Sequence, residues 1–426
     1  MCDELKVCCK CGNIIDYAHR YMVDRYGNYY CAQDMPGFNV SLSALCAEQS
    51  GGISSCIYND EIGIKSPVEL KAELDEYIIG QNRTKMILST AVYNHYKRLR
   101  DKTIDKSNVF MLGPTGSGKT YMVKTLAKLL NVPLVIVSAT NLTEAGYKGK
   151  DVQSILSRLL REAGNDELKA ESGIIFIDEI DKIAKKESSA TRDIGGEGVQ
   201  QALLKIIEGC VEEIEVSESD NLVYNGRTVS EKTRIDTTNI LFICGGAFPG
   251  IEDIIRKRLD AGTSSIGFGA AAGHTEPDEN VMLKVTTDDL NKFGMIKEFI
   301  GRCPVIAPLE ELTTEALRKI LTEPKNALVK QYRKLFHYDE VELKVTDDAV
   351  AAIAKKSFER KTGARGLRAI MENIMMDVMY ESPSDDNIAC CTITKDTVEK
   401  GEPPVVEYRT DAIESGKKKN NNGETA

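Results

Sequence analysis

The chain has 426 residues, of which 42% are hydrophobic and 28% charged, a balance that predicts a soluble protein with two or three folded domains. Its net charge of −10 argues against a general nucleic-acid-binding protein, and no apolar run reaches the roughly 18 residues that a membrane helix needs. The acidic, Cys-rich start "MCDELKVCCKCG" does not resemble a signal peptide, so we expect a cytoplasmic protein with neither nucleic acid nor a membrane as partner.

Residues 1–60 are expected to form a small Cys-rich module followed by a linker. Most of the 12 cysteines of the chain lie in this segment. Because the thiols of a cytosolic protein stay reduced, such a cluster indicates a bound metal ion and not a set of disulfides. The stretch "SGGISSCIYNDEIG" at the end of the module is rich in Gly and Ser and is typical of a linker.

Residues 61–305 predict a large α/β domain. Four apolar runs fit buried parallel strands: "NVFML", "PLVIVSA", "GIIFID" and "NILFICGG". Helical patterns lie between them, and this alternation predicts a parallel sheet with helices on both faces.

Residues 306–402 predict a smaller, mainly helical domain. Leu317 and Leu321 have helical spacing before Pro324, and Thr346 could cap a further helix. A last long helix is expected around Leu367. The remaining residues, 403–426, end in the low-complexity stretch "SGKKKNNNGETA" and are expected to form a disordered tail.

The stretch "GPTGSGKT" is a complete phosphate-binding P-loop. It follows the apolar strand "NVFML" and opens a helix, which is the context that the motif requires. Its glycines let backbone N–H groups face the phosphates of ATP, Lys119 would reach the β and γ phosphates, and the Thr120 hydroxyl would hold Mg²⁺. The candidate ATP-binding residues here are Gly113, Pro114, Thr115, Gly116, Ser117, Gly118, Lys119, Thr120 and Tyr121.

The stretch "GIIFIDEIDK" is the expected partner of the P-loop. Its apolar strand places two acids at the carboxyl end of the sheet, where α/β proteins bind ligands. Asp178 can hold the Mg²⁺ ion, and Glu179 is placed to polarise the attacking water. Both are candidate catalytic residues.

With both motifs in place, the chain resembles an AAA+ ATPase, and more narrowly the ClpX family of protein unfoldases. The resemblance covers roughly residues 65–402 and includes "LDEYIIGQNRTKMILSTAVYNHYKRL", "LNKFGMIKEFIGRCPVIAPLEEL" and "RKTGARGLRAIMENI". It implies a ring hexamer that hydrolyses ATP, pulls tagged or unfolded polypeptides through a central pore, works with adaptors and delivers its substrates to a ClpP-type peptidase.

The resemblance also implies four further residues of the ATP site. Ile78 and Ile79 would pack on the adenine base. Arg302, in "FIGRCP", would be an arginine finger that reaches the ATP of a neighbouring subunit, where it stabilises charge on the transferring phosphoryl group. Arg365, in "GAR", would be a second sensor that contacts phosphate in its own subunit and changes the angle between the two domains.

Three loops are implied to face the polypeptide substrate. "AGYKG" resembles the first pore loop, with Tyr147 as the gripping residue and Lys148 where the family usually has a branched aliphatic side chain. "GGEG" resembles part of the second. Around the pore entrance the family carries an Arg-Lys-His motif, of which only Arg227 is matched, so we expect altered substrate choice. The implied residues of the second loop are Gly195, Gly196 and Glu197.

Two apolar side chains stand in the Gly-rich stretch "TSSIGFGAAAG", where a loop offers them nothing to pack on. The "IGF" tripeptide resembles the family's loop for docking on the peptidase. Ile266 and Phe268, with Gly267 between them, would then insert into apolar clefts on that partner.

The Cys-rich module resembles the zinc-binding domain of the family, which has two C-x-x-C pairs. Cys8 and Cys11 form the first pair, and Cys31 and Asp34 have the spacing of the second. A structural Zn²⁺ held by three thiolates and a carboxylate is chemically allowed. Alternative ligands remain: Cys9 for Cys8, and Cys46 or His19 for Asp34.

Three other functions fit parts of the sequence. A related HslU-type unfoldase shares a similar pore loop but lacks the Cys-rich module and the "IGF" loop. A nucleotide-switched chaperone or adaptor would bind proteins without pulling or degrading them. An AAA+ loader that acts on DNA is disfavoured by the acidic balance and by Tyr147.

Overall fold

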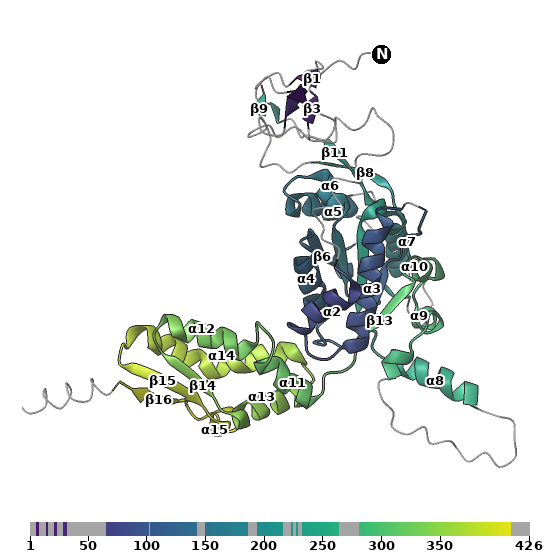
Figure 1. The fold of residues 1–426 in the computed structure, drawn as a ribbon. Coiled ribbons are helices and arrows are strands. Elements are labelled where there is room, and N and C mark those ends of the chain that lie inside the picture. The colour runs from purple at the N-terminus through teal and green to yellow at the C-terminus, as the bar shows by residue number, and fades with distance from the viewer. Residues whose placement is uncertain are drawn as a thin grey trace, which may run out of the picture.

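The computed structural model describes two folded bodies and several short strands of the N-terminal module (Figure 1). In the N-terminal module the described strands are β1 (Lys6–Val7), β2 (Ile14–Ile15), β3 (Tyr21–Val23) and β4 (Tyr29–Cys31), which pair as two antiparallel hairpins, β1 with β2 and β3 with β4. Beyond them the described residues are 65–101, 103–142, 150–185, 194–215, 223–224, 227–228, 232–263 and 281–409.

A parallel sheet forms the centre of the larger body. Its strands lie in the order β13-β5-β12-β7-β6, and every pair is parallel, which confirms the predicted α/β sheet. Four strands coincide with the four apolar runs, whereas β13 falls where helices were expected to begin. The strands are β5 (Val109–Leu112), β6 (Leu134–Ser138), β7 (Ile174–Asp178), β12 (Leu241–Gly246) and β13 (Val305–Pro308).

Helices cover both faces of this sheet. Successive side chains of each strand point to opposite faces, and both faces carry apolar side chains that the helices bury. In β7, Ile174 and Phe176 pack under one group of helices, and Ile175 and Ile177 under the other. The first group is α2 (Pro67–Asp75), α3 (Asn82–Arg98) and α4 (Lys119–Leu130). The second is α5 (Lys150–Glu162), α6 (Glu167–Glu171), α7 (Ile194–Glu208), α8 (Ile251–Thr263), α9 (Thr287–Phe293) and α10 (Lys297–Arg302).

The smaller body has its own core of buried aliphatic and aromatic side chains. The predicted helices are confirmed, and the Thr346 hydroxyl caps one of them by accepting a hydrogen bond from the Ala349 N–H at 3.2 Å. The helices are α11 (Thr314–Thr322), α12 (Leu328–Tyr338), α13 (Asp347–Glu359), α14 (Ala364–Glu381) and α15 (Lys395–Glu399).

A three-stranded sheet in this body was not predicted. β14 (Glu342–Val345) pairs in parallel with β15 (Ile388–Ile393), and β15 pairs antiparallel with β16 (Val405–Tyr408). The expected disordered tail from residue 403 is therefore corrected: its first residues complete the sheet, because Cys391 of β15 lies opposite Val406 in the ladder.

Short 3-10 helices connect several of these elements. They are η3 (Ala139–Asn141), η5 (Ile180–Ile183), η7 (Thr237–Asn239), η8 (Val281–Lys284) and η9 (Ser382–Ser384). Among the described residues, no helix is both long and apolar enough to cross a membrane.

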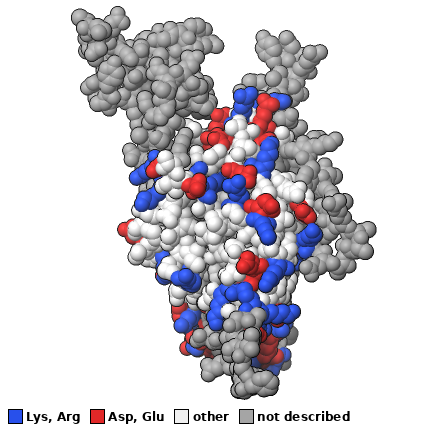
Figure 2. Space-filling model, turned by 90° about the vertical axis from the view of Figure 1, so that its right-hand side faces the viewer, with Lys and Arg blue, Asp and Glu red and all other residues white. Residues whose placement is uncertain are grey.

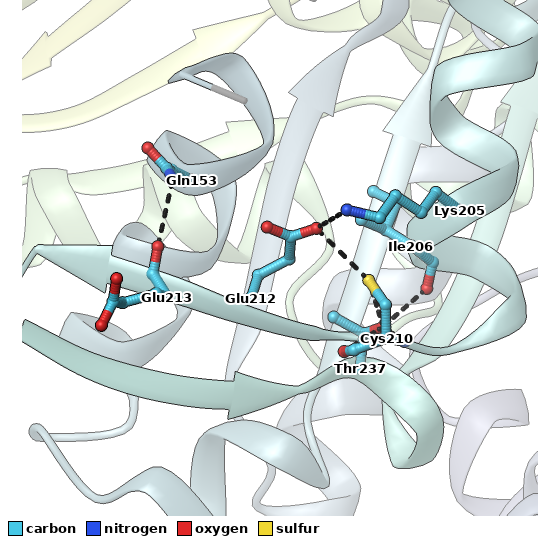
Figure 3. Close-up of polar contacts among 7 residues, drawn as sticks. All are labelled: Gln153, Lys205, Ile206, Cys210, Glu212, Glu213 and Thr237. Atoms are coloured by element: carbon cyan, nitrogen blue, oxygen red, sulfur yellow. Dashed lines mark hydrogen bonds and ion pairs between the residues drawn. The ribbon is translucent and has the colours of Figure 1, made fainter. Parts of the chain in front are cut away.

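An antiparallel hairpin, β8 (Val211–Glu215) with β11 (Lys232–Asp236), extends from the end of α7. The Thr237 hydroxyl, which accepts from the Cys210 N–H at 2.9 Å and donates to the Ile206 carbonyl at 2.9 Å, joins the hairpin to α7 (Figure 3). On α5, the Gln153 amide donates to the Glu213 carbonyl at 3.1 Å. Beyond the hairpin lie two short paired strands, β9 (Val223–Tyr224) and β10 (Arg227–Thr228).

The carboxyl of Glu171, at the end of α6, fastens the same hairpin from its other side. It accepts a hydrogen bond from the Asp236 N–H at 2.8 Å. Burial raises the pKa of Glu171 to about 7, and the charges of Asp236 and Glu167 raise it too, although that hydrogen bond lowers it. In the unfolded chain the carboxyl has its ordinary pKa near 4.5, so the unfolded state loses this proton at lower pH than the folded state does.

We predict that Glu171→Gln makes the large domain more stable than the wild type by about 1 to 2 kcal/mol at pH 8.5, with almost no difference at pH 4.5. The wild type loses stability as pH rises from about 4.5 to about 7, because a carboxylate must then be buried. Urea unfolding at several pH values measures the difference. Glu162→Gln, at an exposed position, controls for the lost charge. A Glu171→Gln effect that is constant across pH would contradict the prediction.

Candidate functional site

The P-loop joins the buried strand β5 to α4. Two of its glycines have left-handed backbone conformations, with φ of 80° at Gly116 and 100° at Gly118. A side chain is strained in this region, so the loop needs glycine there to turn its backbone inward. Position 113 needs glycine for a different reason, because a Cβ added there would lie 2.7 Å from the Cβ of Leu309.

The buried amine of Lys119 points back into the loop. It donates to the carbonyl of Gly113 at 2.6 Å and to that of Pro114 at 3.1 Å. Burial lowers the pKa of Lys119, and the nearby charge of Arg365 lowers it further, although Asp178 and another aspartate oppose the shift. A desolvated cation inside a ring of backbone groups fits a polyphosphate, whose negative charge would satisfy it.

Two side-chain oxygens that could bind a metal ion lie close together beside the loop. The Thr120 hydroxyl, in the first turn of α4, donates to Asp178 Oδ2 at 2.9 Å, and Asp178 is the last residue of β7. Their meeting follows from the parallel pairing of the strands, which brings the carboxyl ends of the strands to one edge. Hydroxyl and carboxylate oxygens are the ligands that Mg²⁺ takes in nucleotide sites, so these residues fit a nucleoside triphosphate bound together with Mg²⁺.

Glu179 is held in place by two hydroxyls that the sequence analysis did not assign. Its Oε2 accepts from Ser138 Oγ at 2.7 Å and from Thr140 Oγ1 at 3.3 Å. The residue itself has φ of 59°, a conformation that turns the chain sharply after the strand. Ser138 ends β6, and a polar residue at the end of an apolar run was a signal available in the sequence.

No polar side chain stands at the tip of β12, which ends in Gly245 and Gly246. The structure gives a steric reason. A Cβ at Gly245 would lie 2.6 Å from the Phe176 ring, and a Cβ at Gly246 would lie 2.5 Å from the ring of Phe248. The polar side chain beside this tip is that of Asp181, whose Oδ1 accepts a hydrogen bond from the Ala247 N–H at 3.0 Å.

The start of α14, in the smaller body, lies directly on the P-loop. The Ala364 N–H donates to the Gly116 carbonyl at 3.1 Å. A Cβ on Gly363 would lie 2.8 Å from the Gly116 carbonyl oxygen, so only glycine permits this approach. Arg365 follows in the first turn of α14 with an exposed side chain. A pocket at this contact is lined on one side by Pro114 to Ser117 and on the other by residues of the smaller body.

The segment expected to hold the adenine base lies at the same junction. Ile78 is buried and Ile79 half-buried. After them, Gln81 exchanges two hydrogen bonds with the backbone of Glu310, at 2.8 and 2.9 Å, where the chain leaves β13 for the smaller body. Lys325 of that body pairs with Glu76 at 2.6 Å. Both bodies thus contribute to the surroundings of Ile78 and Ile79.

Arg302 lies away from its own P-loop. Its carbonyl accepts from the Asn108 amide at 2.8 Å, and Asn108 directly precedes β5, whereas the P-loop follows the other end of that strand. The exposed guanidinium pairs with Glu208, at the end of α7, with an Nε to Oε1 distance of 2.8 Å. The structure therefore separates Arg302 from the residues of its own ATP site, which it gathers at the opposite edge of the sheet.

All three residues expected in the second pore loop are helical and not part of a loop. Gly196 and Glu197 are in the first turn of helix α7 and not in a loop. A Cβ on Gly196 would lie 2.8 Å from the Ile183 carbonyl oxygen, so this turn packs tightly on η5. Glu197 pairs with Lys185 at 3.5 Å. Gly195 is in the same turn of α7.

Several other expected sites fall outside the described residues. Tyr147 and Lys148 of the first pore loop do so, as does the whole docking tripeptide, Ile266, Gly267 and Phe268.

Arg227, expected at the pore entrance, is described. It begins β10 and lies opposite Tyr224 of β9.

The proposed zinc site also falls outside the described residues for the most part. Cys8, Cys11 and Asp34 lie outside them, and Cys31 is described only as the last residue of β4. Elsewhere in the described ranges, no group of three or more His, Cys, Asp or Glu side chains could hold a metal ion.

Comparisons with known proteins agree with this geometry. Residues 104–306 match the AAA domain of the Cdc48 subfamily, and residues 312–394 match the C-terminal, D2-small domain of ClpB protein. The ATP-dependent Clp protease ATP-binding subunit ClpX of Treponema denticola is 51% identical over 333 residues, which are 75% of this chain and 78% of that protein. ATP-dependent Clp protease ATP-binding subunit ClpX 3 of Methylococcus capsulatus is 46% identical over 371 residues, which are 83% of this chain and 84% of that protein.

We predict that Gly363→Ala lowers the rate of ATP hydrolysis about ten-fold, because the added methyl group separates α14 from Gly116. The matched control is Gly401→Ala, which also puts a side chain at positive φ but meets nothing within 4 Å. Each change should cost about 1 to 3 kcal/mol of stability through backbone strain. Phosphate release and thermal unfolding measure both effects. Equal hydrolysis rates in the two variants would contradict a role for the Gly116–Gly363 contact.

Proposed function

Because this chain belongs to the ClpX family of ATP-binding subunits of the Clp protease and hydrolyses ATP through its AAA domain, we propose that it is a protein unfoldase. In this proposal the chain forms a ring hexamer, pulls tagged or unfolded polypeptides through the pore and delivers them to a ClpP-type peptidase. The contact between the P-loop and α14 carries the proposal, since it links the ATP site to a second body, whose position would change with the bound nucleotide.

Each residue of the ATP site has a proposed task. The P-loop N–H groups and Lys119 would bind the phosphates, and Thr120 with Asp178 would hold the Mg²⁺, which neutralises phosphate charge when bound. Glu179 would orient the attacking water and accept its proton, while Ser138 keeps the carboxylate fixed.

The site between subunits follows from the position of Arg302. It lies near the end of β5 opposite its own P-loop, so we assign it to the ATP of a neighbouring subunit as an arginine finger. Arg365 opens α14 beside the P-loop of its own subunit, and its charge already reaches Lys119. We assign it to phosphate contact within the subunit, as the second sensor.

The substrate and partner sites are proposed from the sequence. Tyr147, Lys148 and Arg227 would face the polypeptide, and Gly195, Gly196 and Glu197 would support the second pore loop from the first turn of α7. Ile266, Gly267 and Phe268 would dock on the peptidase. Cys8, Cys11, Cys31 and Asp34 would hold a Zn²⁺ ion in a module that binds substrates or adaptors.

The surroundings in which the protein works are also part of the proposal. Where Figure 2 shows Lys and Arg side chains on the described surface, Asp and Glu lie among them. Together with the net charge of −10, this favours protein over nucleic acid as the substrate. We place the protein in the cytoplasm. Its domains would be the module up to residue 60, the large domain to 305 and the small domain after it.

A degron-tagged, stably folded fluorescent protein tests this function. We predict that fluorescence falls only with ATP and that the loss becomes permanent only when a ClpP-type peptidase is added. Glu179→Gln should bind ATP but hydrolyse it about 10² to 10⁴-fold more slowly and leave the fluorescence intact. Phe268→Ala should abolish only the step that needs the peptidase.

Two results would contradict the proposal. If Glu179→Gln still unfolded the substrate, the motor assignment would be wrong. If the wild type hydrolysed ATP but left several tagged substrates folded, a nucleotide-switched chaperone or adaptor would be the better function. Substrates that carry different tags distinguish the two explanations for a folded substrate: unfolding with some tags but not others indicates altered substrate choice, and unfolding with none indicates loss of pulling.

A further inference from the structure

Three segments of the large domain meet around one buried side chain, the amide of Gln200 on α7. Its exposed fraction is 0%. Nε2 donates to the carbonyl of Ile183 at 2.8 Å and to that of Gly294 at 3.4 Å. Oε1 accepts from the N–H of Ile296 at 2.9 Å. The amide therefore uses its donor and its acceptor at once, and all its partners are backbone groups of other segments.

Two of these segments carry residues of the ATP chemistry. Ile183 ends η5, the 3-10 helix that directly follows Asp178 and Glu179. Ile296 is the N-cap residue of α10, and the last residue of that helix is Arg302. The Gln200 amide thus connects the acidic edge of one ATP site with the helix that presents the arginine finger.

The joint around Gln200 leaves little room for independent movement. Gly294 has φ of 116°, and a Cβ there would lie 2.3 Å from the Lys185 carbonyl oxygen. The Gly294 carbonyl in turn accepts from the Lys185 N–H at 2.9 Å. On α7, Gly196 also packs closely on the Ile183 backbone, since a Cβ there would lie 2.8 Å from the Ile183 carbonyl oxygen. α7 and α10 pack on each other, side by side in Figure 1.

We propose that Gln200 is a positioning residue for Arg302. Its amide fixes the first turn of α10, and this helix of 6 residues transmits the position over about 9 Å to the backbone of Arg302. The inference rests on the proposed function, because Arg302 acts there on the ATP of a neighbouring subunit. It adds to that function a residue that touches neither nucleotide nor neighbour and yet sets the rate at the neighbour's site.

Gln200→Met tests the proposal, because methionine keeps the length of the side chain and removes both hydrogen-bonding ends. The matched control is Gln201→Met, the next residue of α7, whose side chain is exposed. We expect Gln200→Met to lower kcat for ATP hydrolysis about ten-fold and to leave the affinity for ATP unchanged, since its own binding residues are intact. Equal kcat values for the two variants would overturn the proposal.

Mixed rings test the direction of the effect. Glu179→Gln subunits have a defective site and an intact finger, whereas Arg302→Ala subunits have the reverse. Gln200→Met subunits mixed with Glu179→Gln subunits should regain hydrolysis, because the partner supplies the finger. Mixed with Arg302→Ala subunits they should not. The opposite pattern, or no rescue in either mixture, would overturn the proposal by placing the defect in the site of the Gln200→Met subunit itself.

A mixture of Glu179→Gln with Arg302→Ala subunits separates this inference from the function on which it rests. Hydrolysis in that mixture supports a finger that acts between subunits. If the mixture is inactive although both variants assemble, the finger assignment in the proposed function is wrong, and the role of Gln200 falls with it. If that mixture is active but the Gln200→Met mixtures fail as above, only the inference is wrong.

A second pair of variants covers a Gln200→Met chain that fails to fold. Ile296→Pro removes the N–H whose hydrogen bond Gln200 Oε1 accepts, together with the isoleucine side chain, and Ile296 already has φ of −73°, which proline adopts. Ile296→Ala keeps the N–H and controls for the lost side chain. We expect the same ten-fold loss of kcat and the same rescue pattern from Ile296→Pro alone. Equal behaviour of both variants would overturn the proposal.

Discussion

The hydrogen bond from Ala364 to Gly116 is the contact on which the rest of this account depends. It joins the P-loop, which we propose holds the phosphates of ATP, to the first turn of the helix that carries Arg365. Gly363 permits the approach because any side chain there would meet the Gly116 carbonyl. In the proposed function, a change in the charge or size of the bound nucleotide would act through this contact on the position of the smaller body, which is what a motor requires.

The central sheet places two groups of candidate site residues at its opposite edges. Its carboxyl edge gathers Lys119, Thr120, Asp178 and Glu179, whereas Asn108 holds the Arg302 backbone beside the start of β5. In the proposed function, one subunit would therefore offer a nucleotide site at one edge of the sheet and an arginine finger near the other. Hydrogen bonds between buried side-chain amides and backbone groups, at Asn108 and Gln200, hold the segment that ends in Arg302 without introducing charge into the core.

The sequence predicts the parallel sheet and the ATP site because both follow from local patterns. Apolar runs followed by glycines or acids identify β5 and β7 with the residues after them. Gln200 has no such signal, since its partner Ile296 lies 96 positions away in the sequence. The strands of the smaller body were missed because "ELKV" and "IACCTI" are short runs between strong helical patterns. The helical state of Gly195 and Gly196 was missed because glycines usually indicate loops.

Hydrogen exchange at the Ala364 amide tests the central contact most directly. The measurement compares the peptide that contains Thr362 to Ala364 in the Glu179→Gln chain with ATP and in the wild type with ADP, and it uses β15 as an internal reference. Our account predicts slower exchange with ATP, because phosphate draws Arg365 and α14 toward the P-loop, and unchanged exchange in β15. Identical exchange of this peptide in both states would contradict the claim that the nucleotide controls the smaller body through this contact.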